Sequence, residues 1–165
     1  MSLSVRDEVE ADHEAIAGLT GRAFDTTPHS DGSEVAIVER LRELGHMTLS
    51  LVASLDGAIV GHVAFSPVSV SDASGNWYGL GPISVEPERQ KSGIGSALIK
   101  AGFERLRQLG AEGCVLVGDP AYYSRFGFSN DGRVQYLDVP SQYVQWVAFG
   151  SDLPAGELIY SPAFG

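Results

Sequence analysis

The chain has 165 residues, 44% of them hydrophobic and 19% charged, with a formal net charge of −10. This length and composition are typical of one globular domain, so we expect a single domain over residues 1–165. The negative charge argues against nucleic acid as a partner, because the phosphate backbone attracts basic proteins. No apolar run approaches the roughly 20 residues of a membrane-spanning helix, which argues against a membrane partner.

The chain has one cysteine, Cys114, at the start of an apolar stretch, where a buried structural thiol is the expected role. One cysteine, with no two histidines at helical metal-binding spacing, predicts that there is no metal site. The N-terminal sequence MSLSVRDEVEADHE is too acidic and too polar for a signal peptide, so the expected location is the cytoplasm.

The charges are unevenly distributed along the chain. Acidic residues dominate the first 60 positions, whereas five of the eleven basic residues lie between positions 89 and 107: Arg89, Lys91, Lys100, Arg105 and Arg107. One part of the chain could therefore attract a phosphate and another a cationic amine. The alternative is that the acidic residues only form a solvated surface that keeps the protein soluble.

A strand and two helices are predicted in the first 45 residues. Weak alternation indicates a strand over residues 3–9, and Asp12 is placed to cap a helix over residues 13–24. A second helix is expected over residues 33–45, where Asp31 and Glu34 have capping-box spacing. The residues expected to face the core are Ile16, Leu19 and Phe24 in the first helix and Val35, Val38 and Leu41 in the second.

Residues 48–71 predict a hairpin, because two alternating runs flank Asp56-Gly57, a strong signal for a two-residue turn. His62 lies in the second run, where a packed histidine is favoured over a catalytic one. The next strand begins near Trp77 and contains Pro82, which has no N–H to donate to a sheet. Pro82 therefore marks either a strand end or a bulge.

A strand, a glycine-containing turn and a helix follow one another up to Gly110, which is placed as the C′ glycine of that helix. The expected apolar face of the helix is Ile94, Leu98, Gly102, Leu106 and Leu109. Residues 114–117 then indicate a buried strand, parallel to its neighbour because a helix connects the two. Asp119 and Pro120 begin a short helix that Gly127 ends. The closing strands are expected over residues 142–149 and 157–164.

The turn before the long helix has the chemistry of an anion site, because the first N–H groups of a helix lack internal partners and lie at the positive end of its dipole. Gly93 and Gly95 let a phosphate approach these groups, and Arg89 and Lys91 add positive charge. No P-loop sequence is present, and a Rossmann turn is excluded because its third glycine position is Leu98. The expected ligand is a phosphate or pyrophosphate.

The same turn resembles the Gln/Arg-x-x-Gly-x-Gly/Ala motif of the GNAT acyltransferase superfamily, carried here by Gln90, Gly93 and Gly95. The preceding strand, the helix, the strand GCVLVGD and the segment AYYSRFGF match as well, so the resemblance covers most of the chain. The chain is similar to the small stand-alone bacterial members of this superfamily, which are described as predicted N-acetyltransferases. The resemblance implies an α/β domain with a mixed sheet of about seven strands and helices on both faces. It also implies transfer of an acetyl group from acetyl-coenzyme A to a primary amine by direct attack.

The resemblance further implies roles for particular residues. The backbone of Ile83, Ser84 and Val85 would hold pantetheine, beside a bulge at Pro82. Tyr123 is the candidate acid, because the family often places a tyrosine four residues before the Gly-Phe that ends the short helix, and Tyr122 is the alternative. The pyrophosphate would be held by the turn and the first residues of the helix, which are Gln90, Lys91, Ser92, Gly93, Ile94, Gly95 and Ser96.

The general base stays open. Some family members carry a glutamate on the fourth strand, but residues 77–81 contain no carboxylate, and Glu86 is expected to be solvated. Water, which is favoured, Glu34 and His29 remain as candidates, and no base is needed if the amine arrives deprotonated. In the family the first two helices border the acceptor site, so Glu34 could instead touch an amine, or it could only cap its helix.

Other functions make different demands on the sequence. Ser66, Ser69 and Ser92 do not lie in a Gly-x-Ser-x-Gly elbow, which argues against a serine hydrolase. A non-catalytic acyl-coenzyme A binding or sensing module would keep the phosphate turn and lose transfer. A homodimeric scaffold could use the aromatic residues of the closing strands, which are Tyr143, Trp146, Phe149 and Tyr160.

Overall fold

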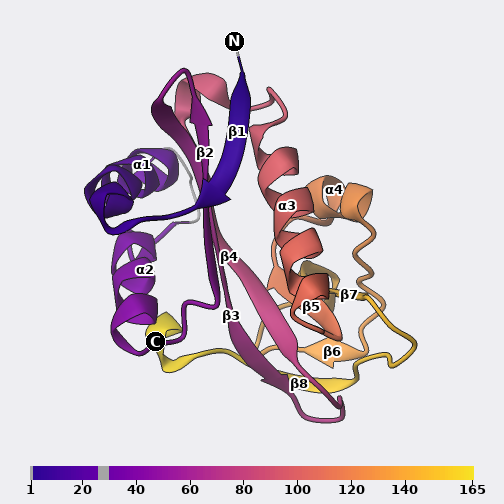
Figure 1. Cartoon of the computed structure of the whole chain (residues 1–165). Helices are drawn as coiled ribbons and strands as arrows, with labels where there is room; N and C mark the ends of the chain where they lie inside the picture. Colours follow the sequence, from indigo (N-terminus) through magenta and orange to yellow (C-terminus); the bar gives the residue numbers. More distant parts are fainter. Residues whose placement is uncertain (1, 26–29) are drawn as a thin grey trace. The chain divides into compact units, whose positions relative to one another are not determined.

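The computed structural model of the protein describes residues 2–25 and 30–165. The chain divides into two compact units, one comprising Met1–Phe65 and Gly81–Arg105 and the other Ser66–Leu80 and Leu106–Gly165. The strands form a mixed sheet of eight with the order β1-β2-β3-β4-β5-β7, in which β8 pairs with β3 and β6 (Figure 1). The mixed α/β sheet expected from the sequence is therefore confirmed, with one strand more than the seven predicted.

The first unit contains the predicted strand and hairpin. Its strands are β1 (Leu3–Asp7), β2 (Leu49–Leu55) and the first part of β3 (Ala58–Val70), with the last part of β4 (Trp77–Val85). β1 pairs with β2, and β2 with β3, both antiparallel. The turn between β2 and β3 has positive φ at both Asp56 (52°) and Gly57 (84°), as the Asp-Gly signal predicts for a type I′ turn.

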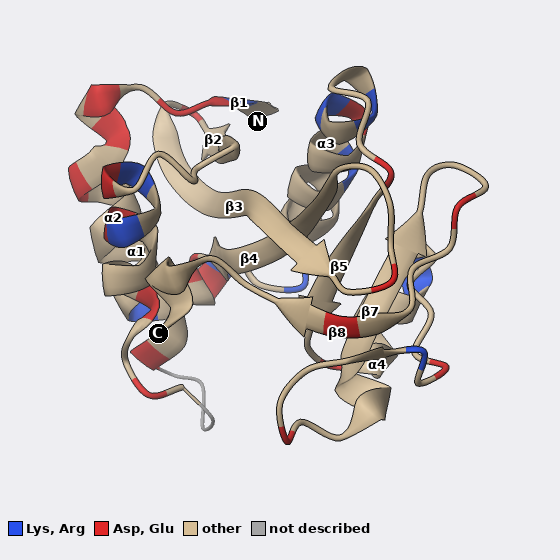
Figure 2. Cartoon of the chain, turned by 90° about the horizontal axis from the view of Figure 1, so that it is seen from below, with Lys and Arg blue, Asp and Glu red and all other residues tan. Residues whose placement is uncertain are grey.

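Helices cover both faces of the strands in this unit (Figures 1 and 2). They are α1 (His13–Asp25) and α2 (Glu34–Glu43) on one face and α3 (Ile94–Gln108) on the other. On the first face Ile16 of α1, Val38 of α2 and Val52 of β2 form a buried cluster. Of the other residues expected to face inward there, Leu19 and Leu41 are buried, whereas Phe24 and Val35 are only half-buried.

On the second face, α3 approaches β3 closely. A Cβ atom on Gly102 would lie 2.3 Å from the ring of Phe65, so only glycine fits at this position of the apolar face. Leu109 was expected on the same face, but α3 ends at Gln108 and the Leu109 side chain is 53% exposed. Phe103 is buried in its place.

Asp12 does not cap α1 as predicted, because its carboxylate turns back to the residues before it. It accepts hydrogen bonds from the Val9 N–H at 2.8 Å and from the Arg6 guanidinium at 2.7 and 3.1 Å. These bonds, the one from Arg6 first, lower the pKa of Asp12 from 3.8 to about 2. Asp12 thus ties β1 to the start of α1.

We expect Asp12→Asn to destabilise the protein at neutral pH and less so in acid. Because folding lowers the pKa of Asp12, its stabilisation is complete above its unfolded pKa and is lost as the pH falls through about 2. Urea unfolding of wild type and variant should show a gap in unfolding free energy that is constant above about pH 5 and narrows below about pH 4. The exposed Asp138 provides the control Asp138→Asn, for which no such gap is expected. A gap that does not depend on pH would contradict this role.

The second unit contains the remaining strands, β5 (Gly113–Val117), β6 (Val134–Gln135), β7 (Val144–Ala148) and β8 (Gly156–Ile159). β5 is parallel to β4, as expected, and antiparallel to β7. The unpredicted strand is β6, which has two residues and pairs with β8. Trp77, Val115 and Trp146 belong to the buried core of this unit, and Tyr160 packs against it.

The short helix of the second unit follows the prediction. α4 (Pro120–Tyr123) begins at Asp119, whose carboxylate accepts the Ala121 N–H at 2.9 Å. A 3-10 turn continues it to Phe126, and Gly127 ends it with φ 91°. Cys114 is fully buried, and burial raises the pKa of its thiol well above the ordinary value, so it is an unreactive structural residue.

Candidate functional site

The predicted phosphate turn begins at Glu86, which is anchored in three ways. Its N–H donates to the Val60 carbonyl and its carbonyl accepts from the Arg89 N–H, both at 2.8 Å. Its carboxylate accepts from Nε and Nη2 of Arg22 on α1, both at 2.9 Å. Glu86 was expected to be solvated; its side chain is 23% exposed, but it is also paired with Arg22, whose hydrogen bond lowers the pKa of Glu86. Glu86 therefore fixes the start of the turn and is a poor candidate for the general base.

The turn itself presents a row of backbone donors. Lys91 and Gly93 have φ values of 65° and 90°, and α3 begins at Ile94 with the Gly93 carbonyl accepting the Ala97 N–H at 3.0 Å. Within the described part of the chain, no hydrogen bond uses the N–H groups of residues 92–96. Ser92 and Gly93 are exposed, whereas Ile94 is buried, so the donors at the start of this row are open to an anion from solvent.

Side chains at this turn leave the approach clear. A Cβ atom on Gly93 would meet nothing within 4 Å, so no protein atom crowds the turn at this position. Ser92 Oγ donates back to the Arg89 carbonyl, and Gln90 Nε2 reaches the Val85 carbonyl at 3.4 Å. The backbone N–H groups are therefore the principal contacts that this turn offers to a ligand.

The last residues of β4 lead directly into this turn. Ile83 and Val85 are half-buried, whereas Ser84 is 2% exposed and its Oγ has no partner among the described residues. The β4–β5 ladder ends at the pair Gly79–Val115, although β5 continues to Val117. This early end agrees with the predicted irregularity near Pro82, because proline contributes no donor to a ladder.

Tyr123 lies at the end of α4, in the second unit, whereas the phosphate turn belongs to the first. Its ring packs edge-on against Tyr122 at 4.9 Å and Phe128 at 6.1 Å between centroids. Burial, with smaller contributions from neighbouring groups, raises the pKa of Tyr123 well above the ordinary value of 10. Its hydroxyl is therefore protonated at neutral pH and can act as a hydrogen-bond donor.

Glu34 begins α2, but it does not form the predicted capping box. It accepts a hydrogen bond from Ser30 Oγ at 2.6 Å, while the Asp31 carboxylate accepts the Ser33 N–H at 3.0 Å. One oxygen of the Glu34 carboxylate is thus engaged locally, and the residue is half-buried. His29, the other candidate base, lies outside the described residues.

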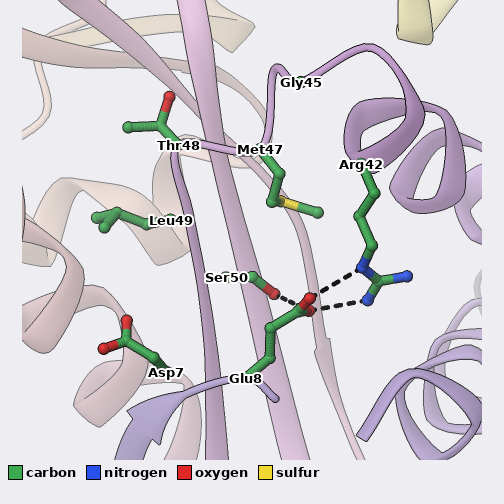
Figure 3. A pocket seen from close by; sticks show the side chains of 8 residues that line it. All are labelled: Asp7, Glu8, Arg42, Gly45, Met47, Thr48, Leu49 and Ser50. Atoms are coloured by element: carbon green, nitrogen blue, oxygen red, sulfur yellow. Dashed lines mark hydrogen bonds and ion pairs between the residues drawn. The ribbon is translucent and has the colours of Figure 1, made fainter. Parts of the chain in front are cut away.

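Glu8, Arg42 and Ser50 line an open pocket of about 340 Å³ and are joined by hydrogen bonds (Figure 3). His62 extends this polar cluster through Ser50. Glu8 accepts two hydrogen bonds from Arg42, at 2.9 and 2.8 Å, one from His13 at 2.9 Å and one from Ser50. Since the one hydroxyl hydrogen of Ser50 is donated to Glu8, Ser50 Oγ accepts from His62 Nε2 at 2.8 Å.

This cluster does not have the order of a catalytic triad, because the serine lies between the acid and the histidine. Burial lowers the pKa of His62 to about 4, so the ring is neutral at neutral pH. Burial alone would raise the pKa of Glu8, but the bonds from Arg42 and Ser50 lower it below the ordinary value. His62 Nε2 is bonded within the cluster, whereas the buried Nδ1 has no partner among the described residues. His62 is a packed strand histidine, as expected.

Among the residues that the structure describes, no three side chains of histidine, cysteine, aspartate or glutamate lie together in a group that could hold a metal ion. None of the helices described combines the length and the apolarity needed to cross a membrane.

Comparison with known proteins agrees with this geometry. The sequence profile of the acetyltransferase (GNAT) family matches residues 10–128. The chain belongs to this family. A curated relative, the uncharacterized N-acetyltransferase YhbS of Escherichia coli strain K12, is 38% identical over 125 residues, which cover 75% of this chain and 72% of YhbS. The matched region contains the phosphate turn, α3, β5 and Tyr123 of this GNAT protein.

Solved structures extend the similarity to the whole chain. A GNAT family acetyltransferase from Brucella melitensis, crystallised in complex with acetyl-CoA, is 44% identical, with a TM-score of 0.88 and 99% coverage of both chains. The YhbS protein of Escherichia coli, in complex with CoA, is 31% identical with a TM-score of 0.87, covering 98% of this chain and 91% of that one. The GNAT fold that the motif predicted is thus confirmed.

Proposed function

We propose that this GNAT protein transfers the acetyl group of acetyl-coenzyme A to a primary amine, with residues 1–165 acting as one catalytic domain in the cytoplasm. The observation that carries the proposal is the row of unpartnered N–H groups from Ser92 to Ser96, which begins at the exposed residues Ser92 and Gly93. A diphosphate is the ligand that such a row binds best, because several donors and the dipole of α3 act together. Acetyl-CoA in the similar Brucella protein supports the same cofactor here.

In this proposal the residues of the first unit hold the cofactor. Gln90 to Ser96 bind the pyrophosphate, mainly through the backbone, and the exposed Lys91 adds charge. The backbone of Ile83 to Val85 binds pantetheine. An N–H near Ser84 or Val85 also donates to the thioester carbonyl, where negative charge develops as the amine attacks.

The chemical step then needs little from the protein. A neutral amine attacks the carbonyl carbon, a C–N bond forms, the C–S bond breaks, and coenzyme A leaves as a thiolate. Tyr123 donates a hydrogen bond and a proton to that sulfur, and water accepts the proton lost by the nitrogen. Water is preferred as the base because Glu86 is held by Arg22 and Glu34 accepts a bond from Ser30.

We expect acetyl-coenzyme A to bind with micromolar affinity in titration calorimetry. ATP should bind at least about tenfold more weakly, because it lacks the pantetheine group that is proposed to bind to the backbone at the end of β4. Release of free thiol with a panel of amines would then separate an enzyme from a binding or sensing module. Absence of acetyl-coenzyme A binding would refute the proposal.

The scaffold alternative is less well supported. Trp146 is 8% exposed, and Tyr160 packs against the same core. Two of the four aromatic residues considered for an interface therefore pack inside the second unit. Tyr143 is 42% exposed and remains available to a partner.

A further inference from the structure

A pocket of about 200 Å³ lies where α1 ends and α2 begins. Its polar side chains are the carboxylates of Asp25 and Glu34 and the hydroxyls of Thr20 and Ser30. None of the described residues that line it is basic. The lining therefore presents hydrogen-bond acceptors and negative charge, which select for a cationic donor.

Thr20 is the unusual member of this set. Its side chain is 1% exposed, and Oγ1 has no hydrogen-bond partner among the described residues. A threonine inside a helix ordinarily bonds back to the carbonyl four residues earlier or points to solvent, and Thr20 does neither. An unmade hydrogen bond at a buried hydroxyl is costly, so Thr20 is best explained by a ligand that supplies the missing partner.

The other side of the pocket is apolar. Phe24 and Val35 line it and are only half-buried, although the sequence pattern places both on core-facing positions. An aliphatic chain that covers them would remove apolar surface from water. The pocket thus combines a wall for methylene groups with acceptors for an ammonium group.

The nitrogen bound here is not the one that is acetylated. Attack on a thioester requires a neutral amine, whereas nearby carboxylates favour the protonated form and raise the pKa of a bound amine. A nitrogen held by Glu34 and Thr20 would be a poor nucleophile. The pocket suits a group that stays charged throughout the reaction.

We propose that the acceptor is an aliphatic diamine or polyamine, and that its second, protonated amino group binds in this pocket between Thr20 Oγ1 and the Glu34 carboxylate. This assignment rests on the acetyltransferase function proposed above. The three N–H donors of the ammonium group match the oxygen atoms that Thr20, Glu34 and Asp25 bring to the pocket. Of these, Thr20 Oγ1 has no partner among the described residues, and one oxygen of Glu34 already accepts from Ser30. The intervening methylene groups lie along Phe24 and Val35.

The test is titration calorimetry of the full chain, saturated with coenzyme A, with 1,5-diaminopentane and pentylamine. These probes differ only in whether the far end carries an ammonium group or a methyl group. We expect the diamine to bind about tenfold more tightly, and Glu34→Gln and Thr20→Val each to remove most of that preference while pentylamine binding is unchanged. Thr20→Val keeps the shape of the side chain and removes only the hydroxyl.

The matched control is Glu39→Gln, which removes the same charge from an exposed position of α2 and should leave the preference intact. Equal affinity of wild type for the two amines would overturn the proposal, as would a preference that survives in both pocket variants. The acetyl-coenzyme A titration answers a separate question. If that cofactor does not bind, the proposed function fails, whereas the diamine preference of the free protein still decides what the pocket binds.

Discussion

Gly93→Asp should abolish acetyl-coenzyme A binding, with an affinity loss of at least about 100-fold in titration calorimetry. The substitution puts a carboxylate beside the row of N–H groups of residues 92–96, where the pyrophosphate is proposed to lie. A Cβ atom at Gly93 would meet no protein atom within 4 Å, so the structure has room for the new side chain. Two like charges about 4 Å apart repel by about 4 kcal/mol at the effective dielectric constant of a protein surface, which is ample for this loss. The side chain also fills volume that the phosphate needs.

Gly57→Asp is the control that separates this effect from backbone strain. Gly57 has φ 84°, against 90° for Gly93, and a Cβ atom on either residue would meet nothing within 4 Å. Both variants therefore bear a similar cost of about 1 kcal/mol for a side chain in the left-handed region, and both add one negative charge. Only the variant at Gly93 should lose the cofactor. Affinity that persists in Gly93→Asp would show that the cofactor site is elsewhere.

The sequence was sufficient where neighbouring residues determine the structure. The Asp56-Gly57 turn, the Asp119 cap and the Gly127 stop all depend on residues a few positions apart, and all three formed as predicted. The phosphate turn belongs to the same class, because its donors come from the start of a helix and its open approach comes from glycine. Lys91 was less predictable, since lysine has no preference for its φ of 65°.

The sequence was insufficient where partners are distant or where a bond is missing. Arg22 and Glu86 are 64 positions apart, so no local pattern could show that the carboxylate before the turn is paired. Asp12 had the spacing of a cap, but Arg6 and the Val9 N–H compete for the same carboxylate and bind it. The strand β6 exists only because it lies beside β8. The free hydroxyl of Thr20 is a property of the folded helix pair alone.

Tyr123→Phe should lower turnover at least about tenfold while acetyl-coenzyme A binding stays near wild type. A hydrogen bond to a charged group is worth about 1.5–3 kcal/mol, and the thiolate bears its charge only as the C–S bond breaks, so the loss falls on the chemical step. An ordinary phenol, with a pKa of about 10, is already a weaker acid than a thiol of about 8.5. Burial raises the pKa of Tyr123 further, so its hydrogen bond to the sulfur contributes more than complete proton transfer.

The phenylalanine ring preserves the packing of Tyr123 against Tyr122 and Phe128, so the thermal midpoint of unfolding should not change. Tyr122→Phe removes the neighbouring hydroxyl from the same helix and should leave thiol release at the wild-type rate. Comparing kcat from thiol release with the dissociation constant from calorimetry separates a catalytic role from a structural one, since lost packing would weaken both. Unchanged turnover in Tyr123→Phe would remove this residue from the mechanism and leave solvent as the source of the proton.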